Sequence, residues 1–434
     1  MAKEKITDTD TICAIATASG GALGIIRISG PDSFAATSAI THLDCESVVA
    51  NTIHFTRITD EKGAIIDEVI ISVYRAPHSY TGEDSVEISC HGSSYILSKV
   101  LELLLKNGCR MANPGEYTMR AYLNGKKDLT QAEAVADLIA STNKTTHHLA
   151  MSQMRGGITN ELGRLSNQLL RLTSLLELEL DFSDHEDLKF ADRNELLSLA
   201  SQIDNQICRL AESFQTGNAL KQGIPVAIVG APNVGKSTLL NQLLGEERAI
   251  VSDIQGTTRD AIEDTIQLEG ITFRFIDTAG IRHTSDQIEQ MGIERSVSAA
   301  QRARIIIMMA EPGVPFPDLD VREDQTIIRV VNKTKEFQAK FGIGLDALRK
   351  QLLASLPKAS DTDIIITNAR HYEALLRAQT SLHRVIEGLQ SGISGDLLAE
   401  DLRDVLNILA EVTGERITPQ ETLNNIFKHF CVGK

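Results

Sequence analysis

The chain of 434 residues contains no tryptophan, and aromatic residues make up only 4% of it. It also has no excess of basic residues, because its formal net charge is −15. Platforms that stack single-stranded nucleic acids rely on aromatic rings, and nonspecific nucleic-acid binding relies on Lys and Arg. The composition therefore argues against broad nucleic-acid binding as the main activity, and any contact with RNA must use a local basic patch.

Cysteine is scarce as well, and the six cysteines include no Cys-x-x-Cys pair. That pattern argues against a disulfide framework and against a zinc site, and it favours a reducing compartment. No apolar run is long enough to cross a bilayer, and the N-terminus has no apolar segment typical of a secretory signal. We therefore expect a cytoplasmic protein with no membrane partner.

Two kinds of hydrophobic pattern divide the first half of the chain. Residues 1–125 predict an α+β domain, with one helical run at 95–106 and short strand-like runs between Gly- and Pro-marked turns. Residues 126–222 predict a helical domain, because leucines recur at three- and four-residue steps and indicate a buried seam. The strand-like runs are 12–18, 24–28 and 68–74, and the seam consists of Leu162, Leu165, Leu169, Leu172 and Leu176.

Residues 223–358 alternate between apolar strands and helices. The strands are nearly continuous apolar runs, which suit a mostly parallel sheet that is buried on both faces. Residues 359–434 return to a helical pattern, so this domain is expected to be inserted into a helical domain made of two segments. The fold class is thus predicted to be multidomain α/β and α+β. The four expected strands are 226–229, 273–276, 305–309 and 327–331.

A phosphate-binding loop is the most specific local motif of the chain. Residues 230–237 read GAPNVGKS, which matches GxxxxGK followed by Ser or Thr, and the loop precedes a helix expected at 237–244. Its glycines let backbone N–H groups face a phosphate, and Lys236 brings a positive charge to the β- and γ-phosphates. Ser237 offers a hydroxyl to Mg²⁺. The loop therefore predicts that a nucleoside triphosphate is bound and hydrolysed.

Two further motifs favour a GTPase over a dinucleotide-binding domain. Residues 256–260 read GTTRD, and residues 277–280 read DTAG directly after an expected strand. At that position Asp277 can hold Mg²⁺ through water, and Gly280 can offer an N–H to the γ-phosphate. The GTP-binding residues expected from these motifs and from the segment after the last strand are Asn233, Val234, Gly235, Lys236, Ser237, Thr238, Gly256, Thr257, Thr258, Asp277, Thr278, Ala279, Gly280, Asn332 and Lys333.

The segment expected to read the base departs from the usual guanine-binding motif. The residues after the strand at 327–331 are Asn332-Lys333-Thr334-Lys335, so a lysine stands where an aspartate normally pairs with guanine. An ammonium group has no acceptor for the N1–H and the exocyclic amine of guanine. The following segment is short, with Gln-Ala-Lys at 338–340 in place of Ser-Ala-Lys. The possibility that the chain is a paralogue with relaxed guanine specificity therefore stays open. Competition between GTP and ATP for binding would test it.

Several motifs in a fixed order resemble the MnmE family, also called TrmE, of GTPases that modify the wobble uridine of tRNA. The resemblance covers nearly the whole chain. It implies an N-terminal folate-binding domain that dimerises, a discontinuous helical domain and an inserted Ras-like P-loop G domain. Besides the phosphate-site motifs, the matching segments are GIIRISG at 24–30, YTGED at 80–84, PGEY at 114–117, LNGK at 123–126, QAEA at 131–134 and FCVGK at 430–434.

The resemblance also implies a chemistry and partners. The family acts as a homodimer with an FAD-dependent protein, MnmG or GidA, in a heterotetramer, and FAD is bound by that partner only. Together they install an aminomethyl or carboxymethylaminomethyl group at carbon 5 of the wobble uridine of tRNA, using 5-formyl- or 5,10-methylene-tetrahydrofolate. By position, Arg27, Glu87, Lys126 and Lys434 match the residues that contact the folate. Cys431 matches a thiol close to it that is a candidate catalytic nucleophile.

For GTP hydrolysis the resemblance implies K⁺ in place of an arginine finger. A cation beside the β- and γ-phosphates would offset the charge that develops there. Glu289 matches the residue that orients the attacking water. An alternative function of a different class stays open. The chain could be a ribosome-assembly GTPase of the Era or EngA kind, which would not bind folate. The resemblance adds Ser252, Asp253, Ile254 and Gln255 to the expected GTP-binding residues. The matching metal ligands are Asn233, Ser252, Ile254 and Thr257 for K⁺, and Ser237 and Thr258 for Mg²⁺.

Overall fold

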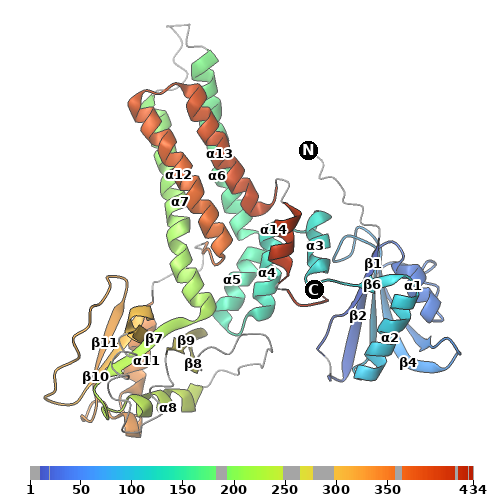
Figure 1. Cartoon of the computed structure of the whole chain (residues 1–434), viewed down its shortest axis with the longest axis horizontal. Coiled ribbons are helices and arrows are strands. Elements are labelled where there is room, and N and C mark those ends of the chain that lie inside the picture. Colours follow the sequence, from blue (N-terminus) through green and yellow to red (C-terminus); the bar gives the residue numbers. More distant parts are fainter. Residues whose placement is uncertain are drawn as a thin grey trace. The chain divides into compact units, whose positions relative to one another are not determined.

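The computed structural model describes residues 10–18, 20–181, 193–247, 264–276, 298–356, 364–415, 419–428 and 430–433. The chain divides into two compact units, and Figure 1 shows their elements. The first unit comprises Met1–Ile139, Gln153–Leu196 and Arg384–Lys434, and the second comprises Ala140–Ser152 and Leu197–His383. In the described residues each unit contains one sheet, and the strands counted below are those of the described residues. Within the described ranges, no helix has the length and apolar character needed to pass through a membrane.

The sheet of the first unit has six strands in the order β3-β4-β5-β2-β1-β6. Only the pairing of β1 with β6 is parallel. The strands expected at 24–28 and 68–74 are confirmed, whereas the strand expected at 12–18 ends earlier, and β3 and β6 were not predicted. The strands are β1 (Thr11–Ile15), β2 (Leu23–Ser29), β3 (Thr52–Thr59), β4 (Ile65–Tyr74), β5 (Ser85–His91) and β6 (Cys109–Met111).

Helices α1 (Ser33–Ile40) and α2 (Ser94–Lys106) cover one face of this sheet. Successive side chains of a strand point to opposite faces, so Ile26 and Ile28 lie in the core under these helices. Arg27, between them, points to the other face. That second face is covered in part by helix α3 (Glu116–Leu123), whose Tyr117 packs against Ile12 and Ala14. We call it the open face of the sheet.

The helical segments follow the sheet and return at the end of the chain. Helices α6 and α13 lie side by side (Figure 1), and the five leucines of the predicted seam are all buried in α6. At the C-terminus, Phe427 and Phe430 pack against Tyr122 and Leu129. The helices are α4 (Leu129–Ala140), α5 (Lys144–Met154), α6 (Gly157–Asp181), α7 (Arg193–Gln222), α12 (Ala369–Ser391), α13 (Gly395–Thr413) and α14 (Gln420–Phe427).

The sheet of the second unit has five strands in the order β11-β10-β7-β9-β8. Every residue of β10 is buried, as expected for a central parallel strand with both faces covered. The four predicted strands are confirmed. The edge strand β8 was not predicted, because polar residues interrupt its short sequence, and it runs antiparallel to β9. The elements are β7 (Ile224–Gly230), α8 (Lys236–Glu247), β8 (Asp264–Leu268), β9 (Ile271–Phe275), β10 (Ile305–Ala310), β11 (Thr326–Val331), η1 (Ala339–Phe341) and α11 (Leu345–Ala354).

Candidate functional site

The phosphate loop joins the end of β7 to the start of α8. Two of its residues have left-handed backbone conformations, Asn233 with φ +59° and Gly235 with φ +102°. A Cβ atom on residue 235 would lie 2.4 Å from the Nδ2 atom of Asn332, so only glycine fits there. The loop therefore leads directly into a helix N-terminus, where unpaired N–H groups favour an anion.

Lys236, the first residue of α8, folds back onto the phosphate loop. Its Nζ atom donates to the carbonyl oxygens of Gly230 and Ala231 at 2.8 and 2.9 Å. Burial lowers the pKa of Lys236, since the site removes water from the ammonium group. In the described part of the chain its partners are carbonyl oxygens rather than a carboxylate. A triphosphate is the kind of group that would supply the missing negative charge.

Asn332 connects the phosphate loop to the segment expected to hold the base. Its Nδ2 atom donates to the carbonyl of Val234 at 2.8 Å, and its Oδ1 atom accepts from the N–H of Ala339 at 3.0 Å. The residue is buried, so both interactions are shielded from water. Lys333 has a φ of +63° and its ammonium pairs with Glu311. Asn332 thus joins the phosphate loop to the segment that is expected to hold the base.

The lysine that replaces the usual aspartate lies at the tip of a tight turn. Thr334 donates its N–H to the carbonyl of Phe337 at 3.0 Å, and its side-chain oxygen accepts from the N–H of Phe337 at 3.0 Å. Lys335 and Glu336 occupy the tip and are both exposed. The turn therefore presents an ammonium group at residue 335, as the sequence indicated.

Many of the predicted nucleotide and metal ligands lie outside the described residues, and the predictions made for them stay predictions. Two of the predicted metal ligands lie in the described residues: Ser237, in the first turn of α8, and Asn233, exposed in the phosphate loop. Within the described ranges, no group of three or more His, Cys, Asp or Glu side chains is placed to hold a metal. The residues outside are Ser252, Asp253, Ile254, Gln255, Gly256, Thr257, Thr258, Asp277, Thr278, Ala279, Gly280, Glu289 and Lys434.

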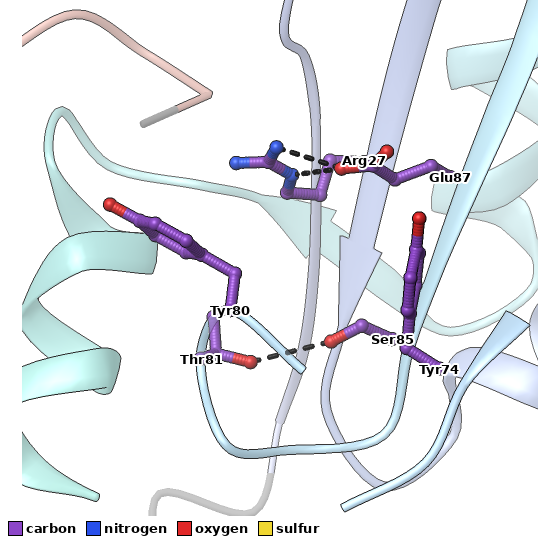
Figure 2. A pocket seen from close by; sticks show the side chains of 6 residues that line it. All are labelled: Arg27, Tyr74, Tyr80, Thr81, Ser85 and Glu87. Atoms are coloured by element: carbon purple, nitrogen blue, oxygen red, sulfur yellow. Dashed lines mark hydrogen bonds and ion pairs between the residues drawn. The ribbon is translucent and has the colours of Figure 1, made fainter. Parts of the chain in front are cut away.

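A cavity of about 210 Å³ opens on the open face of the six-stranded sheet, between β2, β4 and β5. Figure 2 shows Arg27 extended across it toward Glu87, with the ring of Tyr80 beside the guanidinium group. The Nη2 and Nε atoms of Arg27 lie 2.7 and 2.8 Å from Oε1 of Glu87. Both contacts end on the same oxygen, so among the described residues Oε2 of Glu87 keeps the capacity to accept from a ligand. The lining residues are Arg27, Tyr74, Tyr80, Thr81, Ser85 and Glu87.

Two aromatic rings pack against Arg27. Its guanidinium carbon lies 5.3 Å from the ring centroid of Tyr80 and 5.6 Å from that of Tyr117. Burial raises the pKa of Tyr80 and outweighs its hydrogen bond with Thr118 and the nearby charge of Arg27. The phenol is therefore neutral at physiological pH. The arrangement combines flat apolar walls with one carboxylate and one guanidinium, which suits a heteroaromatic ring that carries amide and amino edges.

Hydroxyl groups hold the loop that forms the lower wall of the cavity in Figure 2. The Oγ atom of Ser29 lies 2.7 Å from Oγ1 of Thr81 and 3.1 Å from Oγ of Ser85, and it donates to Glu83 at 2.8 Å. Glu83 in turn forms an ion pair with the largely buried Arg120 at 3.2 Å. The pocket wall is therefore anchored to charges beneath it.

A charge network beneath the pocket centres on Glu116, whose side chain is only 3% exposed. Its Oε1 atom accepts from Arg110 at 2.5 Å and from Arg120 at 3.1 Å, and its Oε2 atom accepts from the N–H of Asn113 at 2.8 Å. Burial alone would raise the pKa of Glu116. The donors outweigh burial, so the pKa lies below its ordinary value.

The C-terminal segment reaches the same region. The carbonyl oxygen of Gly433 accepts from Nη1 of Arg27 at 3.3 Å, and the carbonyl of Cys431 accepts from the N–H of Gly115 at 3.4 Å. Gly433 has a φ of +91°, and a Cβ atom there would lie 2.7 Å from the carbonyl oxygen of Ile15. The thiol-bearing residue Cys431 is exposed. The structure thus brings the predicted residues Arg27 and Glu87 together, beside the segment that contains Cys431.

Lys126, the third predicted folate contact, lies on the neighbouring turn. Its Nζ atom donates to the carbonyl of Pro77 at 2.9 Å, at the start of the loop that carries Tyr80 and Thr81. Four of the residues that line the cavity were not predicted from the sequence. Tyr74, Tyr80, Thr81 and Ser85 belong to strands or motifs that it had noted, and the two-residue spacing of Ser85 and Glu87 on one strand was the available signal.

Known protein families and relatives match nearly the whole chain. A family model described as the MnmE helical domain matches residues 129–431, and one described as the GTP-binding protein TrmE N-terminus matches residues 11–126. A relative from Phocaeicola vulgatus, named tRNA modification GTPase MnmE, is 52% identical and covers 99% of this chain and 100% of its own length. A relative of the same name from Bacteroides fragilis is 50% identical, with coverage of 98% and 99%.

A structure of the Aquifex aeolicus protein Era bound to GDP and aluminium fluoride is 26% identical, covers 36% of this chain and 65% of its own, and gives a TM-score of 0.22.

Proposed function

The chain belongs to the MnmE family of tRNA modification GTPases, and from that premise we propose which reaction its GTPase activity serves. It acts with an FAD-dependent partner, MnmG, to install an aminomethyl or carboxymethylaminomethyl group at carbon 5 of the wobble uridine of tRNA. A tetrahydrofolate bound in the N-terminal pocket supplies the one-carbon unit. The observation that carries the proposal is the contact of Arg27 with both Glu87 and the carbonyl of Gly433.

The residues of the pocket suit a pterin ring. Oε2 of Glu87 is positioned to accept from the amide and amino edge of a pterin, while Arg27 fixes the carboxylate through its other oxygen. The rings of Tyr74 and Tyr80 offer flat walls. Bound tetrahydrofolate would supply the one-carbon unit, and this chain's own residues would orient it. Cys431, the fourth residue from the end of the sequence, would act beside it as a nucleophile in the one-carbon transfer or in the addition to the uridine.

We propose that the protein is a homodimer that pairs through the open face of its N-terminal sheet. Three apolar side chains on that face are exposed: Ile53 by 71%, Phe55 by 70% and Ile70 by 45%. Phe55 and Ile70 lie opposite each other on β3 and β4, so their side chains form one patch. Clustered exposed apolar groups of this kind mark contact surfaces. The homodimer would bind MnmG as a heterotetramer in the cytoplasm, with tRNA as its substrate.

For the GTPase reaction we propose that K⁺ and Mg²⁺ assist hydrolysis. The described residues fit this assignment, because the exposed Asn233 lies in the loop that would surround the phosphates and Ser237 follows Lys236 in the first turn of α8. Ser252, Ile254 and Thr257 would complete the K⁺ site, Thr258 the Mg²⁺ site, and Glu289 would orient the attacking water. In the binding of GTP, Lys236 would neutralise charge on the β- and γ-phosphates.

GTP hydrolysis is expected to be at least about tenfold faster in KCl than in NaCl at equal ionic strength, because a specifically held cation stabilises the transition state. Phosphate release at saturating GTP measures this. In the variant Asn233→Gly, which tolerates the left-handed backbone but lacks the amide, the preference for KCl should disappear. Equal rates of the wild type in the two salts would contradict the K⁺ assignment.

Deletion of the gene in its native host is expected to remove the carbon-5 substituent from wobble uridines, because the enzyme proposed to install that substituent would be missing. Mass analysis of nucleosides from purified tRNA measures the change. Re-expression of the wild type should restore the modified nucleosides, and re-expression of Lys236→Ala should not. An unchanged nucleoside profile in the deletion strain would overturn the proposed function.

A further inference from the structure

We infer that Lys127 binds an anionic group of the molecule that occupies the N-terminal pocket, namely a carboxylate of the glutamate tail of a folate. The inference rests on the proposed one-carbon function and adds a specificity-determining residue to that site. It is drawn from the position of Lys127 beside Tyr80, from the lack of a carboxylate partner among the described residues, and from the size of the cavity.

The turn that carries Lys127 is fixed to the wall of the pocket. Nδ2 of Asn124 donates to the carbonyl of Thr81 at 2.8 Å, and Nζ of Lys126 donates to the carbonyl of Pro77 at 2.9 Å. A Cβ atom on Gly82 would lie 3.1 Å from Cβ of Asn124, so the two segments are in close contact. The main chain of Lys127 is therefore held at a defined place relative to the pocket.

The ammonium group of Lys127 lies against a ring that lines the pocket. Its Nζ atom is 5.6 Å from the ring centroid of Tyr80, and the hydroxyl of Tyr80 is hydrogen-bonded to Thr118 at 2.9 Å, which fixes the ring. Arg27 packs on the same ring, but Glu87 neutralises its charge. Lys127 is the second cation beside Tyr80. Unlike Arg27, it forms no ion pair with a carboxylate in the described part of the chain.

The nearest carboxylate in the sequence is engaged elsewhere. Oδ1 of Asp128 accepts from Thr130 at 2.7 Å and from the N–H of Gln131 at 2.8 Å, and its Oδ2 atom accepts from Thr159 at 2.7 Å. Asp128 therefore caps the start of α4. Burial lowers the pKa of Lys127 by more than the nearby charge of Asp128 raises it, and burial likewise lowers the pKa of Lys236 in the phosphate loop. A half-buried cation of this kind gains energy when an anion arrives.

The cavity is too small for a whole folate. At about 210 Å³ it lies below the ~300–1,000 Å³ of pockets that enclose a drug-sized ligand, so it can hold a ring system but not the aminobenzoate and glutamate parts. The tail must leave the cavity past one of its walls. Tyr80 is the wall behind which Lys127 lies, since Lys127 contacts that ring without lining the cavity itself. An exit at this wall brings the tail carboxylates to an ammonium group.

The test compares two probes with the full chain by titration calorimetry: 5-formyltetrahydrofolate, and tetrahydropterin, which has no anionic tail. For Lys127→Met we expect the Kd of 5-formyltetrahydrofolate to rise about tenfold, while the Kd of tetrahydropterin stays unchanged. Lys127→Arg should retain most of the affinity. Lys62→Met, which removes an exposed lysine from the turn between β3 and β4, is the matched control and should bind both probes like the wild type. Added salt should weaken folate binding by the wild type more than by Lys127→Met.

Either of two results would overturn this inference and leave the proposed one-carbon function intact. Unchanged folate affinity in Lys127→Met would show that the ammonium group does not touch the tail. An equal loss for both probes would show that Lys127 acts only by orienting Tyr80. If the wild type binds neither probe, the one-carbon proposal itself fails and this inference fails with it, so the two failures are distinguishable.

Discussion

Replacing Lys236 by alanine is expected to lower kcat for GTP hydrolysis by about a hundredfold to a thousandfold, because the reaction then lacks a cation aimed at the developing negative charge. In the structure the ammonium group is partly buried and bonded only to the carbonyls of Gly230 and Ala231 among the described residues. These carbonyls do not neutralise it, so bound phosphates would. The same substitution should weaken GTP binding, since the charge also stabilises the ground state.

Phosphate release at saturating GTP measures this effect, and thermal unfolding checks that the variant is folded. The control is Lys350→Ala, which removes an exposed lysine from α11 of the same unit and should hydrolyse GTP like the wild type. Wild-type hydrolysis by a folded Lys236→Ala protein would show that the loop does not carry the reaction. The nucleotide site would then have to be sought elsewhere in the chain.

Replacing Glu116 by glutamine is expected to lower the free energy of unfolding by about 3 kcal/mol, because it leaves the buried guanidinium group of Arg120 and the partly exposed one of Arg110 without their shared carboxylate. Arg120 keeps Asp10 and Glu83 as partners, which places the expected loss at the lower end of such effects. Urea unfolding of the full chain measures it. Glu102→Gln is the control, since Glu102 pairs with Lys99 and Lys106 on the surface of α2 and its loss should change stability little.

The pH dependence of this contribution follows from the direction of the pKa shift. The pKa of Glu116 is lower in the folded protein than its ordinary value of 4.5, so the unfolded chain takes up the proton first as the pH falls. The stabilisation is therefore complete above about pH 4.5 and is lost as the pH falls through the lower, folded-state value. The variant Glu116→Gln should lack this part of the acid sensitivity. Parallel acid transitions of the two proteins would contradict the assignment.

Much of the fold was available from the sequence, because hydrophobic periodicity reports burial directly. The leucine steps from Leu162 to Leu176 predicted a buried seam, and all five leucines are buried in α6. The apolar run at 305–309 predicted a central strand, and β10 is buried throughout. Strands β3 and β8 escaped prediction, since edge strands have one exposed side and a weaker pattern. The family resemblance read from the ordered motifs is confirmed by the match to relatives that are half identical.

The candidate sites also contain some features that could be predicted from the sequence and others that could not. The phosphate loop is local in sequence, because one continuous segment supplies its glycines, its lysine and the following helix, so Lys236 and Gly235 could be recognised without a fold. The substitution of Lys335 for an acid was equally visible, and the structure places that lysine at an exposed turn. The link from Asn332 to Val234 was not visible, since it joins residues far apart in the chain.

By itself the sequence identified the family and predicted the phosphate loop, because the first depends on motifs in a fixed order and the second on neighbouring residues. Only the tertiary structure decided that Arg27 lies between Glu87 and the carbonyl of Gly433, and that Lys127 lies against Tyr80 without a carboxylate among the described residues. The physical reason is that a pocket is formed by groups that are brought together across strands, a loop and a chain end. Sequence periodicity tells which face of a strand a residue occupies, but packing decides which distant side chain meets it there.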